Sequence, residues 1–166
     1  MRSFPTGKEI SGILSPGDSV EGKAAFVSRQ QNEKAVQECL GVCQFPYGIG
    51  LVSDKLVNLL NAAVGTSHDN DTLTNTGERV WNLSRCFNVR EGISRKDDIL
   101  PAKFANEPLP DGLHKGSVLA YEQQNQMLDE YYELRGWTML GKPTQKKLVE
   151  LDLNEHAVEL WAEGEW

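Results

Sequence analysis

The clearest helical pattern in this sequence is the stretch YEQQNQMLDEYYEL, which spans Tyr121–Leu134. Its apolar side chains recur about every 3.6 residues, the period of an α-helix that buries one face, and they are Met127, Leu128, Tyr131, Tyr132 and Leu134. Gly136 follows, and glycine commonly ends a helix because it adopts left-handed backbone angles without strain. The stretch therefore predicts an amphipathic helix.

Similar patterns predict helices on both sides of this stretch. They are expected over about 19–40, with Ser19 as N-cap and Gly41 as stop, and over 54–64, 72–89, 145–151 and 154–161. Glycine and proline crowd residues 91–118, which predicts a long irregular segment with a short helix after Pro101. No segment alternates in polarity as a strand would. We therefore expect an all-α, multihelical fold over 19–166, preceded by an irregular segment at 1–18.

Two of these helices have a distinct apolar face. The helix over 54–64 is expected to bury Leu56, Leu59, Leu60, Ala63 and Val64. The helix over 72–89 is expected to line one face with Val80, Leu83 and Phe87, with Trp81 beside them. Gly77 lies inside this second helix, where it costs about 1 kcal/mol relative to alanine. It marks either close packing against a neighbour or a shorter helix.

Length, charge and hydropathy restrict the class of protein. The 166 residues fit one domain, and the net charge of −7 with a pI near 5.0 argues against non-specific binding to nucleic acids or anionic membranes. No apolar run approaches the roughly 20 residues that a membrane helix needs, and the N-terminus lacks the apolar core of a signal peptide. We therefore expect a cytoplasmic protein whose three cysteines are free thiols or metal ligands.

The sharpest chemical feature is the segment ECLGVC at residues 38–43. Cys43 is expected just past the end of the first helix, where a thiolate could reach an iron–sulfur cluster or a zinc ion. Two cysteines at this spacing are too few for a closed site, so the alternative is that Cys39 and Cys43 are small buried hydrophobes. Cys86 is expected in the core, and none of the three histidines has a partner at metal-ligand spacing.

Charged residues gather in two places, the loop at 90–98 and the helix around 129–135. One interpretation is that ion pairs lock the long irregular segment onto the helices. The other is a solvated surface, and we favour it for most of these residues because exposed ion pairs contribute only about 0–1 kcal/mol.

Four segments, taken in order, resemble the C-terminal region of the tungsten-containing aldehyde:ferredoxin oxidoreductases. They are 77–92 (GERVWNLSRCFNVREG), 94–101 (SRKDDILP) with 107–110 (EPLP), 127–137 (MLDEYYELRGW) and 143–151 (PTQKKLVEL). Their order and spacing agree with those of the family from about residue 19 to 153. The resemblance implies the multihelical fold of that family's C-terminal domains, with this chain as the C-terminal part of a longer enzyme.

The resemblance also implies roles at residues 38–43. In that family an Asp-x-x-Gly-Leu-Cys motif carries a carboxylate that contacts a pterin and the fourth cysteine ligand of a 4Fe-4S cluster. By this resemblance Glu38 takes the carboxylate position, Val42 takes the leucine position and Cys43 takes the ligand position. Glutamate keeps the charge of aspartate and adds one methylene group. Cys39 has no role in the family motif and is expected in the core.

The implied reaction of the complete enzyme is the oxidation of an aldehyde with water to a carboxylic acid. It takes place at a tungsten bis-pterin centre, and electrons leave through the cluster to ferredoxin. The remaining ligands belong to a missing N-terminal portion or companion subunit, so we expect the isolated chain to be inactive and to bind no cofactor. Alternatives are a cofactor-free interaction or scaffold module, or a relative acting on another substrate such as an aromatic acyl thioester. Apolar faces meant for absent domains would also allow a homo-oligomer.

Overall fold

The computed structural model describes residues 20–42, 54–112 and 114–162. Over these residues it contains helices and no strand, and the helices are α2 (Lys23–Leu40), α3 (Asp54–Val64), α4 (Asn70–Arg90), α5 (Lys103–Asn106), α6 (Tyr121–Arg135), α7 (Gln145–Glu150) and α8 (Asn154–Ala162), with a 3₁₀ turn at Arg95–Asp97. The predicted all-α class is therefore confirmed. The irregular segment predicted at 1–18 lies outside the described residues.

The helix ends follow from capping residues in the sequence. Asp69 begins α4, because its carboxylate accepts a hydrogen bond of 2.8 Å from the backbone N–H of Thr72. Thr144 caps α7, as predicted, because its side chain accepts a hydrogen bond of 3.2 Å from the backbone N–H of Lys147. The helix predicted over 72–89 is longer than expected at both ends, since α4 covers 70–90.

Glycines with left-handed backbone angles limit α2 and α6. Gly41 and Gly136 both have φ of 66° and end these helices, as predicted. The start of α2 differs from the prediction: the helix begins at Lys23, after Gly22 with φ of 72°. The expected N-cap, Ser19, lies outside the described residues.

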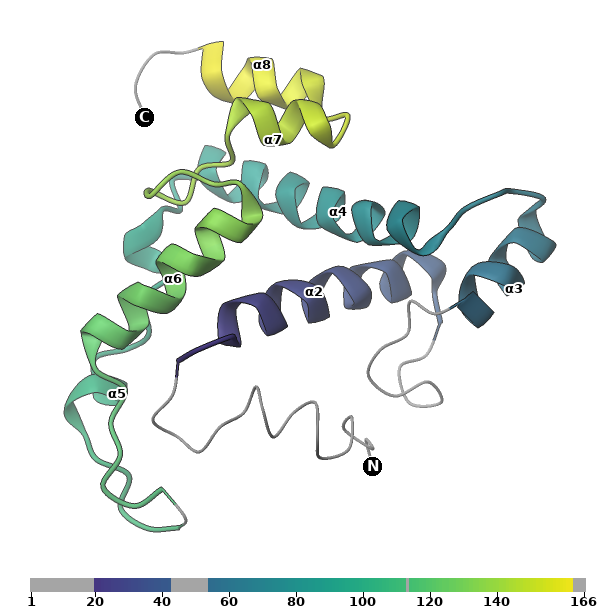
Figure 1. Ribbon diagram of the computed structural model, residues 1–166. Coiled ribbons are helices and arrows are strands. Elements are labelled where there is room, and N and C mark those ends of the chain that lie inside the picture. Colours follow the sequence, from purple (N-terminus) through teal and green to yellow (C-terminus); the bar gives the residue numbers. More distant parts are fainter. Residues whose placement is uncertain (1–19, 43–53, 113, 163–166) are drawn as a thin grey trace.

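The central packing contact joins α2 and α4, which lie side by side in opposite directions (Figure 1). Gly77 of α4 meets the backbone of α2 there, and a Cβ atom at this position would lie 2.2 Å from the carbonyl oxygen of Asn32. Of the two alternatives for Gly77, close packing is thus correct, and α4 continues through it. α6 crosses the first half of α2, while α7 and α8 pack together beside the second half of α4 (Figure 1).

Two apolar clusters lie at opposite ends of α4. The larger cluster joins the end of α4 to α7 and α8, and its members are Cys86, Leu148, Leu151, Leu153, Ala157 and Leu160. The smaller cluster joins the starts of α3 and α4 to α2 and consists of Val36, Val57 and Leu73. Outside these clusters the buried residues include Ala24, Ala35, Leu56, Tyr132 and Trp137 together with the polar side chains Asn32, Gln37, Asn82, Arg85, Gln124 and Arg135.

The predicted apolar faces of two helices are only partly buried. On α3, Leu56 is buried as expected, but Leu59 and Val64 are 61% and 64% exposed. On α4, Leu83 and Phe87 are 41% and 55% exposed. The expectation that the face of α3 is buried was therefore wrong for Leu59 and Val64, because periodicity shows that a face is apolar and not that a neighbour covers it.

No helix among the described residues is both long enough and apolar enough to cross a membrane.

Candidate functional site

The residues expected to meet a cofactor gather at the C-terminal end of α2. Glu38 lies on the last turn with an exposed side chain, and its carboxylate forms a 3.4 Å ion pair with Lys34 one turn earlier. Val42 is half-buried two residues past the helix. Cys43, the predicted cluster ligand, lies outside the described residues. The structure thus places Glu38 and Val42 at the same helix end and does not describe the thiol.

The backbone at this helix end is closed by short-range hydrogen bonds. The N–H of Gly41 donates to the carbonyl of Glu38 at 3.1 Å, and the N–H of Val42 donates to the carbonyl of Gln37 at 3.3 Å. A Cβ atom at Gly41 would meet no atom of the described residues within 4 Å. The two hydrogen bonds therefore define the backbone of this helix end.

Gln37 is a feature of this helix end that the sequence did not single out. Its side chain is 5% exposed, and its amide nitrogen has no hydrogen-bond partner within the part of the chain that the structure describes. A buried amide donor without a partner costs free energy, so such groups usually find one. This donor lies one residue before Glu38, which is where the resemblance expects a pterin.

The described residues at this helix end do not form a complete metal site. Among the described residues, no three His, Cys, Asp or Glu side chains are close enough to hold a metal ion. Iron–sulfur clusters usually take four cysteine ligands. Cys39 is exposed, so the expectation that it lies in the core was wrong. A cluster at this end would need its other ligands from polypeptide beyond this chain.

Arg85, Asp98 and Tyr132 form a buried polar network that connects three segments of the fold. The Arg85 guanidinium donates to both carboxylate oxygens of Asp98, at 3.0 and 2.6 Å, and to the carbonyl of Gly141 at 2.7 Å. The hydroxyl of Tyr132 donates to the same carboxylate. Burial and then the Asp98 carboxylate raise the pKa of Tyr132 well above its usual range. This network holds the irregular segment after α4 against α4 and α6.

Arg135 forms a second buried network that ties α6 to α2. Its side chain has no exposed surface, and the guanidinium donates to Asn32 Oδ1 at 2.5 Å, to Gln31 Oε1 at 2.7 Å and to the carbonyl of Ser28 at 3.1 Å. Its Nε also donates to the hydroxyl of Tyr131 at 3.1 Å. The position of α2, and with it the candidate cofactor end, is thus fixed by buried charge-assisted hydrogen bonds.

These networks overturn the solvated-surface interpretation for several charged residues. Arg135 and Asp98 belong to the buried networks, and Arg95 forms a 2.7 Å ion pair with Asp129 on α6. The other interpretation, in which ion pairs lock the irregular segment onto the helices, is correct for Asp98 and Arg95, whereas Arg135 is buried by hydrogen bonds to α2. Lys96 and Glu133 are exposed, as the solvated-surface interpretation expected.

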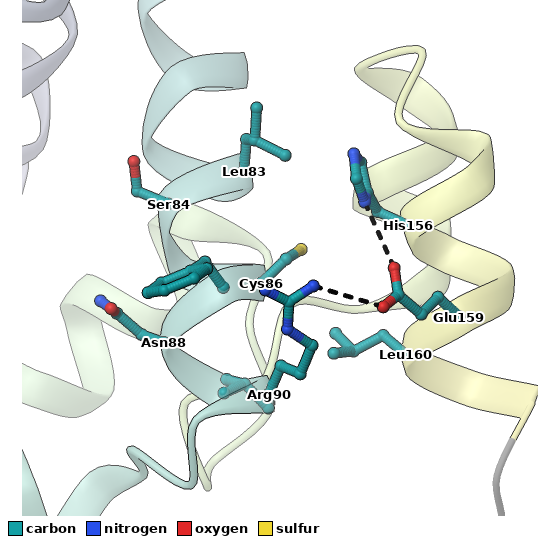
Figure 2. Close-up of a pocket in the computed structure, with 10 residues that line it drawn as sticks. Leu83, Ser84, Cys86, Asn88, Arg90, His156, Glu159 and Leu160 are labelled. Atoms are coloured by element: carbon teal, nitrogen blue, oxygen red, sulfur yellow. Dashed lines mark ion pairs between the residues drawn. The ribbon is translucent and has the colours of Figure 1, made fainter.

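A cavity of about 620 Å³ lies between the end of α4 and α8 (Figure 2). Its rim carries Glu159, which pairs with Arg90 and His156 at 3.5 and 3.6 Å. Cys86 lies at its base and is 5% exposed, so the expectation that this cysteine is in the core is confirmed. Burial, with a smaller contribution from Glu159, raises the pKa of the Cys86 thiol to about 11. The thiol is therefore protonated near neutral pH and is a poor nucleophile.

The exposure of the two described cysteines predicts different reactivity. In a Cys43→Ser variant at pH 8, we expect iodoacetamide to label Cys39 and to leave Cys86 largely unmodified, as mass spectrometry of peptides would show. In urea both thiols should react alike. Equal labelling in the folded chain would contradict the buried position of Cys86.

The buried Cys86 thiol also makes stability depend on pH. Because the folded state raises its pKa from 9.0 to about 11, the contribution of this thiol to stability is fully present below pH 9 and is lost as the pH rises through 11.

Comparison with known proteins identifies the class to which this helical domain belongs. Residues 1–153 match the family model described as aldehyde ferredoxin oxidoreductase, domains 2 & 3. The match includes residues 38–43 and stops before α8. The chain therefore belongs to the aldehyde ferredoxin oxidoreductase family, as the sequence resemblance predicted.

Individual relatives agree with this assignment. The chain is 39% identical over 159 residues to the tungsten-containing aldehyde ferredoxin oxidoreductase of Pyrococcus horikoshii and 35% identical to that of Pyrococcus furiosus. Each alignment covers 93% of this chain and 26% of the relative, so the chain spans about a quarter of the length of these enzymes.

A solved structure has the same fold over nearly the whole chain. It is the active site complex BamBC of benzoyl coenzyme A reductase, described in complex with 1,5-dienoyl-CoA, and it superimposes with a TM-score of 0.72. The superposition covers 98% of this chain and 24% of that chain, at 23% sequence identity. At this identity the similarity establishes the fold alone.

Proposed function

We propose that this chain is the C-terminal helical part of a tungstopterin and iron–sulfur aldehyde oxidoreductase. The observation that carries the proposal is the family match over residues 1–153, which covers the whole candidate cofactor end. The complete enzyme would oxidise an aldehyde with water to a carboxylic acid and pass the electrons to ferredoxin. When bound, the tungsten centre and the cluster supply the redox chemistry, and the protein supplies position and electrostatics.

Within this proposal, three residues at the end of α2 hold the cofactors. The Cys43 thiolate binds one iron atom of the 4Fe-4S cluster. The Glu38 carboxylate accepts hydrogen bonds from pterin N–H groups, for which its exposed position leaves it accessible. Val42 lies at the turn where the backbone would approach the pterin. The amide of Gln37 adds a donor that has no other partner among the described residues.

The rest of the helical domain keeps this end of α2 in place. Arg135 holds α2 against α6, and the contact between Gly77 and Asn32 brings α2 directly against α4. Cofactor-binding groups are most precisely positioned when they are carried by rigid elements with packed supports. The domain would then form one wall of the cofactor cavity, and the rest of the enzyme would supply the others.

The chain by itself is proposed to be inactive. Its described residues contain no complete metal site, and the chain corresponds to only 26% of the length of its relatives. The proposed partner is therefore a missing N-terminal portion or a companion subunit that carries the remaining cysteine ligands.

Metal analysis after co-expression with that companion polypeptide tests the proposal. We expect the purified complex to contain iron and tungsten and the Cys43→Ser variant to lose most of its iron, because one of four cluster ligands is absent. Cys39→Ser is the matched control and should keep its iron, since Cys39 is an exposed thiol four residues away. Glu38→Gln should keep iron and lose tungsten, because it removes only the pterin contact.

Equal iron in the wild type and the Cys43→Ser variant would contradict the ligand assignment. A wild-type complex that contains neither metal would instead favour the cofactor-free interaction or scaffold module. Circular dichroism of each variant would show whether the helical domain is intact.

A further inference from the structure

We propose that a second cavity, between α2, α4 and α6, binds a small aromatic carboxylate. The cavity has a volume of about 600 Å³ and is lined by side chains from all three helices. Pockets for small molecules typically have volumes of about 300–1,000 Å³, apolar and aromatic walls, and a few polar groups. The cavity has all three properties.

The walls of this cavity are aromatic and already fixed in place. Trp81 and Tyr131 both donate hydrogen bonds of 2.7 Å to Gln31, to its backbone and side-chain oxygens respectively. Trp137 donates to the side chain of Asn82 at 2.8 Å. The faces of these rings are partly covered by protein, because Arg135 lies over Trp81 and Tyr131 and Arg85 lies over Trp137. Only the part of each ring that lines the cavity is available to a ligand. A preformed pocket loses little conformational entropy on binding, which favours affinity.

The geometry of the rings favours a planar aromatic ligand. Tyr131 and Trp137 meet edge to face, with ring centroids 5.6 Å apart, and Trp81 lines the same cavity. Aromatic rings add favourable edge-to-face and offset-stacked contacts to the apolar area that they bury. Met127 and Leu128 complete the apolar lining. A flat ring can therefore contact both aromatic and aliphatic walls.

The charges of the lining favour an anion. Arg85 and Asp98 both line the cavity, but they neutralise each other through their two hydrogen bonds. Lys23 is the other charged lining residue, and its side chain is half-buried. The cavity thus carries net positive charge in a protein of net charge −7. Ser84 and Asn88 are exposed polar side chains that can also donate to a carboxylate.

The cavity and the candidate cofactor end use different residues of α2. Lys23 is roughly 22 Å from Glu38 along the helix axis, and Gln31, the lining residue of α2 nearest to Glu38, is roughly 10 Å from it. The inference therefore does not rest on the proposed function, and a chain that never binds metal could still bind the carboxylate.

Isothermal titration calorimetry of the 166-residue chain tests the inference with 2-naphthoate and its neutral analogue 2-naphthylmethanol. We expect saturable one-to-one binding of 2-naphthoate. Lys23→Gln should weaken the binding of 2-naphthoate about fivefold, because an accessible ion pair contributes up to about one kilocalorie per mole. The same variant should leave the binding of 2-naphthylmethanol unchanged. Lys34→Gln, on the same helix outside the cavity, is the matched control and should change neither.

A filling variant locates the binding. Val27 lines the cavity and is 42% exposed, so Val27→Trp should block the binding of both compounds. An unchanged circular dichroism spectrum should show that the helices are intact. The absence of saturable 2-naphthoate binding would overturn the inference. Binding that Val27→Trp leaves unchanged would place the ligand elsewhere and overturn it as well. Equal weakening of both compounds by Lys23→Gln would show that the carboxylate is not recognised.

Discussion

Replacing Asp98 with alanine is expected to lower the free energy of unfolding by about 3 kcal/mol, because it leaves a buried guanidinium without its partner. The Arg85 side chain is 6% exposed, and Asp98 provides two of its hydrogen bonds. Removing one member of a buried ion pair costs more than the pair contributes, since the remaining charge has lost both water and partner. The hydroxyl of Tyr132 loses its acceptor in the same variant.

Urea denaturation followed by circular dichroism would measure this effect. Tyr132→Phe removes only the hydroxyl and should cost about 1 kcal/mol, because the Arg85–Asp98 pair stays intact. Asp111→Ala is the matched control, an exposed carboxylate that should change stability by less than about 0.5 kcal/mol. A loss below about 1 kcal/mol for Asp98→Ala would mean that Arg85 reaches water in the folded chain.

Gly77→Ala is expected to destabilise the chain by about 2 kcal/mol, although alanine is the better helix former. The added Cβ atom would lie 2.2 Å from the carbonyl oxygen of Asn32, which is backbone and cannot rotate away. Overpacking a close contact costs about 1–3 kcal/mol, and here the helices themselves must move apart. Asn32 also accepts a hydrogen bond from Arg135, so its displacement would disturb that network. The gain of about 1 kcal/mol in helix propensity offsets only part of this cost.

Asn75→Ala is the control for this prediction. Asn75 lies two residues away on an exposed part of α4, so alanine there should keep or slightly raise the free energy of unfolding measured in urea. If Gly77→Ala were as stable as Asn75→Ala, the close approach of α2 and α4 would not be needed for the fold.

Local sequence signals were enough to locate the helices. The helix predicted over 54–64 has those bounds, and the helix that begins at Tyr121 ends one residue later than predicted. Gly41, Gly136 and Thr144 limit helices as expected, because capping depends on the backbone angles and short side chains of the residues themselves. The start of α2 was placed wrongly because a left-handed glycine begins it, for which the sequence has no distinctive signal.

Burial could not be predicted in the same way. The apolar residues of α3 follow the helical period, yet Leu59 and Val64 are exposed because the main described neighbour of this helix is α4. Conversely, Arg85, Asp98 and Tyr132 form one buried network although 13 and 34 residues separate Asp98 from the other two. Only the charge of such residues is visible in a sequence, and their partners and exposure are not.

The candidate cofactor end was found by family resemblance and not by spacing. Two cysteines four residues apart do not define a metal site, whereas several segments in the right order do identify a family. The structure adds Gln37 to Glu38 and Val42 at this helix end, and the role of Cys43 stays a prediction. The second cavity had no sequence signal, since its lining comes from three helices far apart in the chain.

The amino-acid sequence by itself determined the helices, most of their ends and the family, because these depend on neighbouring residues and on motifs that keep their order along the chain. Tertiary structure alone decided which apolar faces are covered, which charges are buried together and where cavities form. The physical reason is that burial and ion pairing depend on the separation of groups in space. In this chain the crossing of α2, α4 and α6 sets those separations.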